Sequence, residues 1–323
     1  MTEGPYQETV CKAINWLLAT REVDPDTYIG KAKNEDLSAT CRFGSCDDIG
    51  RLYGHFLAQW GLAEALILGG RAAENECEYN PESCSVDYDE MFLAVQQGAL
   101  FTEMSRNSLA GQGWDYRYGG TTWGLTPFRP GDLSHAKFAA AAQVTADKAG
   151  IPISSAFMQN IALTLANREL NMVSDPSAGS SVGTLYSYKA DWEPSLAMSA
   201  AGLLCRRYVN CSSKKQNHGG IEKNHAATHD FLSGKEPEVT EDVYTLMHLA
   251  LLNHFEGGGP WAAWYAVLAA ELSGHQDTSG GHQDGSYFYN DNDGHNTLGG
   301  RFYWTTFVIL SLTPERSGLR VLE

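Results

Sequence analysis

The sequence has little positive charge. Among its 323 residues, 23 are Lys or Arg and 39 are Asp or Glu, which gives a formal net charge of -16 at pH 7. Nucleic acids and anionic membrane surfaces are bound through clusters of basic residues. This balance therefore argues against both as partners, and it leaves room for cations.

Long apolar runs and several common motifs are also missing. No stretch of 18 apolar residues occurs, so the sequence predicts no membrane-spanning helix. The first residues, MTEGPYQETV, have neither the basic region nor the apolar region of a signal peptide. A mature chain from which an export signal was removed is compatible with this start. Phosphate-binding loops and dinucleotide fingerprints are absent as well.

Cysteine is scarce but clustered. Six of the seven cysteines lie in the stretches CRFGSC, CEYNPESC and CRRYVNC, and Cys11 is left over on a helix. Such spacing favours disulfides over zinc, because the two-residue spacing of zinc knuckles is lacking; thiols are the third alternative. Disulfides predict an extracytoplasmic location, in a periplasm or at a cell surface, with the cytoplasm as the alternative. The predicted pairs are Cys41–Cys46, Cys77–Cys84 and Cys205–Cys211.

Helical periodicity is what the sequence has in abundance. Apolar residues recur at three- and four-residue spacing in ten segments, and no linker separates them, which predicts one all-α domain over residues 1–323. The expected helices span 6–20, 51–71, 86–105, 134–150, 154–171, 194–210, 217–233, 239–256, 260–273 and 297–313. The stretches GWDYRYGG and GTLYSYKADW are compatible with short hairpins or with extended loop segments.

The expected helices are of two kinds. Helices rich in small residues, such as SHAKFAAAAQVTADKAG, alternate with amphipathic ones, such as YQETVCKAINWLL. Small residues suit a closely packed inner ring and one polar face suits an outer ring, so the alternation predicts an α/α toroid of about five inner/outer helix pairs. A solenoid of stacked helix pairs is the alternative.

Four stretches carry a family resemblance. They are GPYQETVCKAINWLL, GWDYRYGG followed by GDLSHAKFAAAAQVTADKAGI, YSYKADWEPSLAMSAAGLLCRRYV, and GSYFYNDNDGHNTLGGRFYWTTFVILSL. In this order they span nearly the whole chain, which resembles the squalene-cyclase and prenyltransferase repeat proteins of planctomycete type. The resemblance implies an α/α toroid with about six helix pairs. The sequence shows only five helix pairs, so either the ring is open or a further short helix lies within 22–48. The fold alone implies no activity.

The catalytic acid of the related class II terpene cyclases has a weak counterpart. In those enzymes an aspartic acid of an Asp-x-Asp-Asp run protonates an alkene and must be kept protonated by its surroundings. The nearest run is Asp87-Tyr88-Asp89-Glu90, which departs at the last position. Asp89 is therefore the candidate acid, and a solvated first turn of a helix is the alternative.

The zinc site of the related protein prenyltransferases is incomplete here. The resemblance places its Asp-x-Cys pair at Asp284 and Ser286, and its histidine at Trp304. Two of the three ligands are replaced, so we do not expect this zinc site. In place of zinc, Tyr287 is expected to stack at a joint between two helices.

Three other groups of polar residues are candidate sites. Asp132 and His135 flank Ser134 at a helix start, which suggests a hydrolase; helix capping is the alternative. Acidic residues in QDGSYFYNDNDG suggest a calcium site without the bidentate Glu of an EF-hand; a polar turn is the alternative. A histidine-rich helix face is the third candidate metal site, with a plain polar face as the alternative. The candidate metal ligands are Asp284, Asp291 and Asp293 for calcium, and Glu222, His225 and His229 on the helix face.

Aromatic residues gather near the expected helix ends. They could line a funnel that takes an apolar or sugar-like ligand, or they could fill the core. The candidate pocket residues are Trp114, Tyr116, Tyr186, Tyr188, Tyr287, Tyr303 and Trp304.

The sequence is compatible with three functions. The first is a binding or scaffold protein, acting as a homo-oligomer or within a larger assembly. The second is an isoprenoid cyclase-like enzyme with a divergent acid. The third is a metal-dependent lyase or hydrolase. No cofactor is expected with certainty, and calcium is the candidate.

Overall fold

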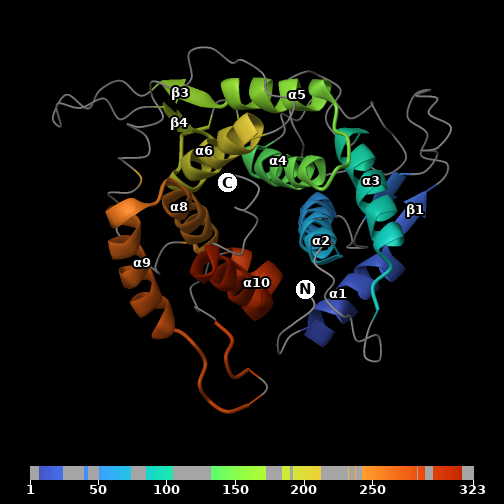
Figure 1. Ribbon diagram of the computed structural model, residues 1–323. Helices are drawn as coiled ribbons and strands as arrows, with labels where there is room; N and C mark the ends of the chain where they lie inside the picture. The colour runs from blue at the N-terminus through green and yellow to red at the C-terminus, as the bar shows by residue number, and fades with distance from the viewer. Residues whose placement is uncertain are drawn as a thin grey trace. The chain divides into compact units, whose positions relative to one another are not determined.

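The computed structural model describes most of the helical part of the chain. The described residues are 7–24, 40–42, 51–73, 85–104, 132–171, 184–189, 192–211, 232, 237, 242–281, 283–287 and 294–314. Within them the chain forms nine helices and four strands of three residues each, so the all-α prediction is confirmed (Figure 1). The arrangement of these helices in a ring stays a prediction.

The helices match nine of the ten predicted segments. The tenth, 217–233, lies outside the described residues except for Leu232. The helices are α1 (Gln7–Thr20), α2 (Arg51–Ala73), α3 (Tyr88–Met104), α4 (Leu133–Lys148), α5 (Ser155–Ala166), α6 (Leu196–Cys211), α8 (Val243–Glu256), α9 (Gly258–Ser273) and α10 (Gly294–Leu312).

The strands form two short antiparallel pairs. Strand β1 (Glu22–Asp24) pairs with β2 (Thr40–Arg42), and β3 (Glu169–Asn171) pairs with β4 (Thr184–Tyr186). The second pair confirms the expected extended structure in GTLYSYKADW. It also corrects the predicted helix over 154–171, because α5 ends at Ala166 and the chain then turns into β3.

The described chain divides into two compact units. Unit 1 comprises residues 1–167 and 208–217, and unit 2 comprises residues 168–207 and 218–323. Each unit is described below by itself. The single-domain prediction is not decided by this division.

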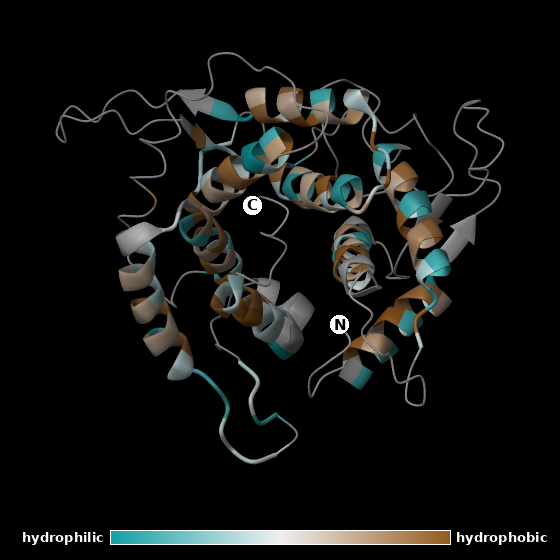
Figure 2. Cartoon of the chain, viewed as in Figure 1, coloured by the Kyte–Doolittle hydropathy of each residue, from teal (hydrophilic) through white to brown (hydrophobic). Residues whose placement is uncertain are grey.

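Helix α4 is the centre of unit 1. It contacts α2, α3 and α5, and every side chain from Leu133 to Ala146 is buried. Its run of four alanines lets neighbouring helices come close. An apolar cluster holds the surrounding helices together and includes Ile14, Leu62 and Met91. Helices α1 and α3 show both apolar and polar residues along their length, as expected for helices with one solvated side (Figure 2).

Unit 2 contains most of α6 together with α8, α9 and α10. Helix α8 contacts both α9 and α10. Leu246 and Met247 of α8 are fully buried, and so is Val308 of α10. The chain enters α8 through Asp242, whose side chain accepts a hydrogen bond from the Tyr244 amide at 3.2 Å.

Replacement of Gly61 by Ala is expected to stabilise unit 1. Gly61 is exposed on α2, and a Cβ atom there would meet no atom within 4 Å. Alanine loses less backbone entropy in a helix, so the free energy of unfolding should rise by about 0.5–1 kcal/mol. Urea unfolding followed by circular dichroism measures this change. A loss of stability would show that the glycine has a packing role.

Candidate functional site

Asp132 and His135 form a buried pair at the start of α4. Both side chains are fully buried. Asp132 is the N-cap residue of the helix: its Oδ1 accepts a hydrogen bond from the His135 backbone amide at 2.9 Å. Its Oδ2 accepts from His135 Nδ1 at 2.6 Å. The sequence therefore identified two residues that do lie together, and both the capping and the pairing are present.

Two hydroxyl groups extend this pair into a cluster of four, which we call the Asp132 cluster: Tyr53, Asp132, Ser134 and His135. Ser134 Oγ donates to Asp132 Oδ1, and the Tyr53 hydroxyl bonds to Ser134 Oγ. The Tyr53 ring also lies against the His135 ring, with the centroids 4.1 Å apart and the planes tilted by 32°. Tyr53 lies on α2, so no spacing within GDLSHAKF could have identified it.

The Asp132 carboxyl group is held in its ionised form. Burial raises the pKa of Asp132, but the charge of His135 and the hydrogen bonds from His135 and Ser134 outweigh burial and leave this pKa below its ordinary value. An ionised carboxylate can orient His135 and Ser134. It cannot protonate an alkene, which needs a carboxyl kept protonated.

The Asp132 carboxylate makes the stability of unit 1 sensitive to acid. A depressed pKa in the folded state means that the carboxylate stabilises the fold above the unfolded pKa of about 3.9 and loses this effect as the pH falls through the folded value. The stability difference between the wild type and Asp132→Asn should therefore be constant near neutral pH and shrink below about pH 4. Chemical unfolding at a series of pH values measures it. A difference that grows in acid would contradict the ionised state.

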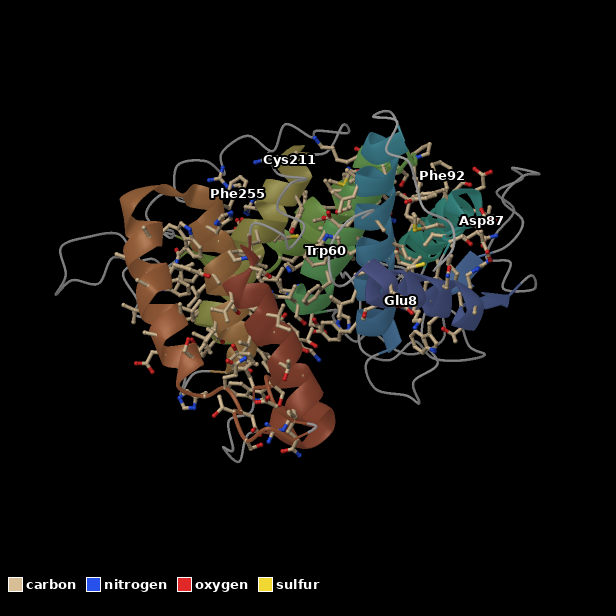
Figure 3. All side chains as sticks on the ribbon, turned by 60° about the horizontal axis from the view of Figure 1, so that its bottom comes forward. Glu8, Trp60, Asp87, Phe92, Cys211 and Phe255 are labelled. Atoms are coloured by element: carbon tan, nitrogen blue, oxygen red, sulfur yellow. The ribbon has the colours of Figure 1, made fainter. Side chains whose placement is uncertain are left out.

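A buried lysine lies near the Asp132 cluster. Lys137 on α4 is fully buried, and its Nζ lies 4.1 Å from the centroid of the Phe138 ring and 4.9 Å from that of Trp60 on α2. Figure 3 labels Trp60. Aromatic faces attract an ammonium group, most strongly when it is desolvated. The two rings therefore give the Lys137 amino group favourable contacts in the core, and sequence reasoning assigned Lys137 no role.

A row of polar side chains joins α2, α3 and α4. His55 Nε2 lies 2.9 Å from Thr102 Oγ1, which donates to Gln59 Oε1 at 2.6 Å. Gln59 Nε2 donates to Gln143 Oε1 at 3.3 Å, and Gln143 Nε2 donates to the Ala99 carbonyl at 2.7 Å. All four side chains are buried. Because the bonds are continuous, this row suits a role in fixing how the three helices align.

Asp89 lies on an exposed helix turn. It belongs to the first turn of α3, and its side chain is exposed. The neighbouring Asp87 accepts a hydrogen bond from the Glu90 backbone amide at 2.9 Å (Figure 3 labels Asp87). The Asp-x-Asp-Glu run therefore begins a helix, and Asp89 lacks the apolar surroundings that would keep a catalytic acid protonated.

The described aromatic candidates lie mostly in the core of unit 2. Tyr186 is fully buried, and Tyr287 and Trp304 are nearly so. Tyr188 and Tyr303 are half-buried; their rings lie beside Trp192 and Phe307 respectively. Trp114 and Tyr116 lie outside the described residues.

Tyr186 belongs to an ionic group with the half-buried Glu169 and the buried Arg206. Its hydroxyl donates to Glu169 Oε1 at 3.1 Å, while Arg206 forms an ion pair with Glu169 and donates from Nε to the Tyr186 hydroxyl. Burial raises the pKa of the Tyr186 phenol, and nearby Cys205 raises it further. Burial also lowers the pKa of Arg206 to about 10. These contacts engage the polar end of Tyr186 within the protein.

The stretch around Ser286 is a joint between α9 and α10. Ser286 Oγ accepts a hydrogen bond from Arg301 at 3.1 Å, and Arg301 also pairs with Asp277 at 3.2 Å. The Tyr287 amide donates to Thr305 Oγ1 at 3.0 Å. These bonds tie the loop to α10.

No metal centre is described in the structure. Within the described residues, no three His, Cys, Asp or Glu side chains are grouped so that they could hold a metal ion. Asp284 is exposed. The other metal candidates lie outside the described residues and stay predictions: Asp291, Asp293, Glu222, His225 and His229.

The predicted disulfide between Cys205 and Cys211 is wrong. Both residues are thiols, one buried and one half-buried. They lie six positions apart on the continuous helix α6, which separates them by about 9 Å along the axis. A disulfide needs Cα atoms within about 7 Å. The side chains of the other predicted pairs, Cys41, Cys46, Cys77 and Cys84, lie outside the described residues.

Comparison with known proteins adds no relative. No protein-family model matches the chain, and neither a curated protein nor a solved structure is similar to it. In the part of the chain that the structure describes, no helix is long and apolar enough to cross a membrane.

Proposed function

We propose that the chain is an α/α-toroid protein of the squalene-cyclase and prenyltransferase repeat type that acts as a binding or scaffold protein rather than as a cyclase. The observation that carries this proposal is the state of Asp132. It is the buried carboxylate among the described catalytic candidates, and both of its oxygens are engaged by Ser134 and His135. Its bonds stabilise the start of α4 and leave it unsuited to donate a proton.

The aromatic side chains support the same proposal. A cyclase needs an open cavity lined by rings, but Tyr186, Tyr287 and Trp304 are buried among other side chains. Other large apolar side chains lie on the surface. The Trp16 side chain on α1, for example, is 61% exposed. Exposed apolar side chains are available to partner chains.

Light scattering of the purified protein tests the scaffold role. An assembly heavier than one 35.3 kDa chain is expected at micromolar concentration. In parallel, incubation with squalene or with geranylgeranyl diphosphate should yield no cyclised or transferred product. A monomer that converts either compound would overturn the proposal.

A second candidate function is favoured by the geometry of the Asp132 cluster. The Asp132 carboxylate bonds to His135 Nδ1, as a carboxylate does when it orients a histidine for acid–base catalysis, although the Ser134 hydroxyl bonds to the carboxylate and not to the histidine. This would make the chain a hydrolase or lyase. A panel of ester and amide substrates tests it: turnover that is lost in His135→Gln but kept in Asp89→Asn would establish it over the binding role.

A further inference from the structure

Cys11 on α1 forms a disulfide that the spacing of the cysteines in the sequence did not suggest. Cys11 is buried and is disulfide-bonded, so it is not left over. Cys205 and Cys211 are thiols. The partner of Cys11 is therefore one of the four cysteines that the sequence pairs with one another: Cys41, Cys46, Cys77 and Cys84.

Asn15 places Cys11 beside the segment that leads into α3. The Asn15 Nδ2 atom donates to the Ser85 carbonyl at 3.0 Å and lies 3.8 Å from Cys11 Sγ. Because both distances share the Asn15 Nδ2 atom, the Cys11 sulfur lies within about 7 Å of the Ser85 carbonyl oxygen, which brings α1 close to the residue before α3 on the cysteine's side. Cys84 directly precedes Ser85 in the sequence, and adjacent Cα atoms are only about 3.8 Å apart.

The direction of the two segments supports the same partner. Asn15 contacts Ser85, and further along both segments Arg21 forms an ion pair with Glu90 at 2.8 Å. The two segments therefore advance in the same sense. One helical turn back from Asn15 is Cys11, and one residue back from Ser85 is Cys84. Apolar packing holds both segments here, since Ile14 belongs to a core cluster against which the partly buried Val86 packs.

Cys41 is a poorer partner. It is paired across the strands with Val23, which follows the C-terminal end of α1. Figures 1 and 3 show β1 leading away from that end of the helix. Cys11 lies about 13 Å of helix rise before Thr20, and the Cα atoms of a disulfide lie within about 7 Å.

We propose that Cys11 and Cys84 form a disulfide that ties α1 to the entry of α3. Two thiols lose two electrons and two protons in this step, and an oxidised disulfide such as glutathione disulfide accepts them as it is cleaved to two thiols. The pairing replaces the local link between Cys77 and Cys84 predicted from the sequence. It also supports an oxidising compartment as the place where the protein works, independently of the proposed function.

Peptide mapping without reduction tests the proposal. The purified chain is equilibrated with reduced and oxidised glutathione, alkylated, and digested with trypsin and a glutamate-specific protease. Glu78 and Glu82 lie between Cys77 and Cys84, so the digest separates these two cysteines. Mass spectrometry should find one peptide pair that joins Cys11 to Cys84. Alkylated Cys11, or Cys11 joined to any other cysteine, would overturn the proposal.

Two matched variants give a second readout. Cys84→Ser should expose Cys11 to alkylation without reduction and lower Tm by on the order of 10 °C, because a large loop is no longer closed. Cys77→Ser, seven positions away, should leave Cys11 protected and Tm nearly unchanged. The reverse pattern would identify Cys77 as the partner and contradict the assignment.

Discussion

Asp132→Ala is expected to lower the free energy of unfolding by about 3–5 kcal/mol, because it removes one member of a fully buried pair. The substitution leaves His135 in the core without its carboxylate. It also removes the side-chain cap of α4, which contributes about 1 kcal/mol of that loss. Urea unfolding monitored by circular dichroism measures the change.

Asp89→Asn is the matched control for this prediction. It also removes a carboxylate from the first turn of a helix, but the side chain is exposed, so the loss should stay below about 1 kcal/mol. If Asp132→Ala were as mild as Asp89→Asn, the Asp132 cluster would not hold α4. Asp132→Asn should fall between the two, since it keeps the shape and part of the cap.

Gly202→Ala is expected to destabilise unit 2 by about 2–3 kcal/mol, through overpacking. A Cβ atom at this position of α6 would come within 2.6 Å of the Tyr186 ring. The ring cannot easily swing away, because it is fully buried and its hydroxyl is bonded to Glu169 and Arg206. The expected result is a lower Tm by differential scanning calorimetry.

Two variants isolate the clash at Gly202. Gly54→Ala is also a glycine-to-alanine change within a helix, but its Cβ would meet no atom within 4 Å, so no loss is expected. Combining Gly202→Ala with Tyr186→Leu should cost less than the sum of the two single changes, because the second removes the ring that the first strikes. Additive losses would show that the ring is not the cause.

The helices could be predicted from the sequence because their signals are local. Apolar spacing predicted a helix over 134–150, close to the observed α4, and the polar residues at its start pointed to Asp132 and His135. The end of α5 was placed too late, because the turn into β3 depends on pairing with β4, a strand thirteen or more residues away.

The rest of the candidate site depends on contacts between distant residues. Tyr53 and Ser134 meet across 81 positions, and Trp60 meets Lys137 across a helix pair, so no local pattern reveals either contact. The prediction of a disulfide between Cys205 and Cys211 was wrong for a related reason. It relied on their closeness in sequence, but the continuous helix α6 holds the two residues apart. The sequence could not show whether the aromatic candidates line a cavity or fill the core. The burial of Tyr186 and Trp304 in the structure places these two in the core.

Product analysis with squalene tests the central claim most directly, because it asks whether any described carboxylate acts as a catalytic acid. Purified wild type and Asp132→Asn are incubated with squalene, and the extracts are analysed by gas chromatography and mass spectrometry. Because Asp132 is held ionised by His135 and Ser134, the binding or scaffold function predicts unchanged squalene in both samples. A cyclised product that forms with the wild type and disappears with Asp132→Asn would contradict it.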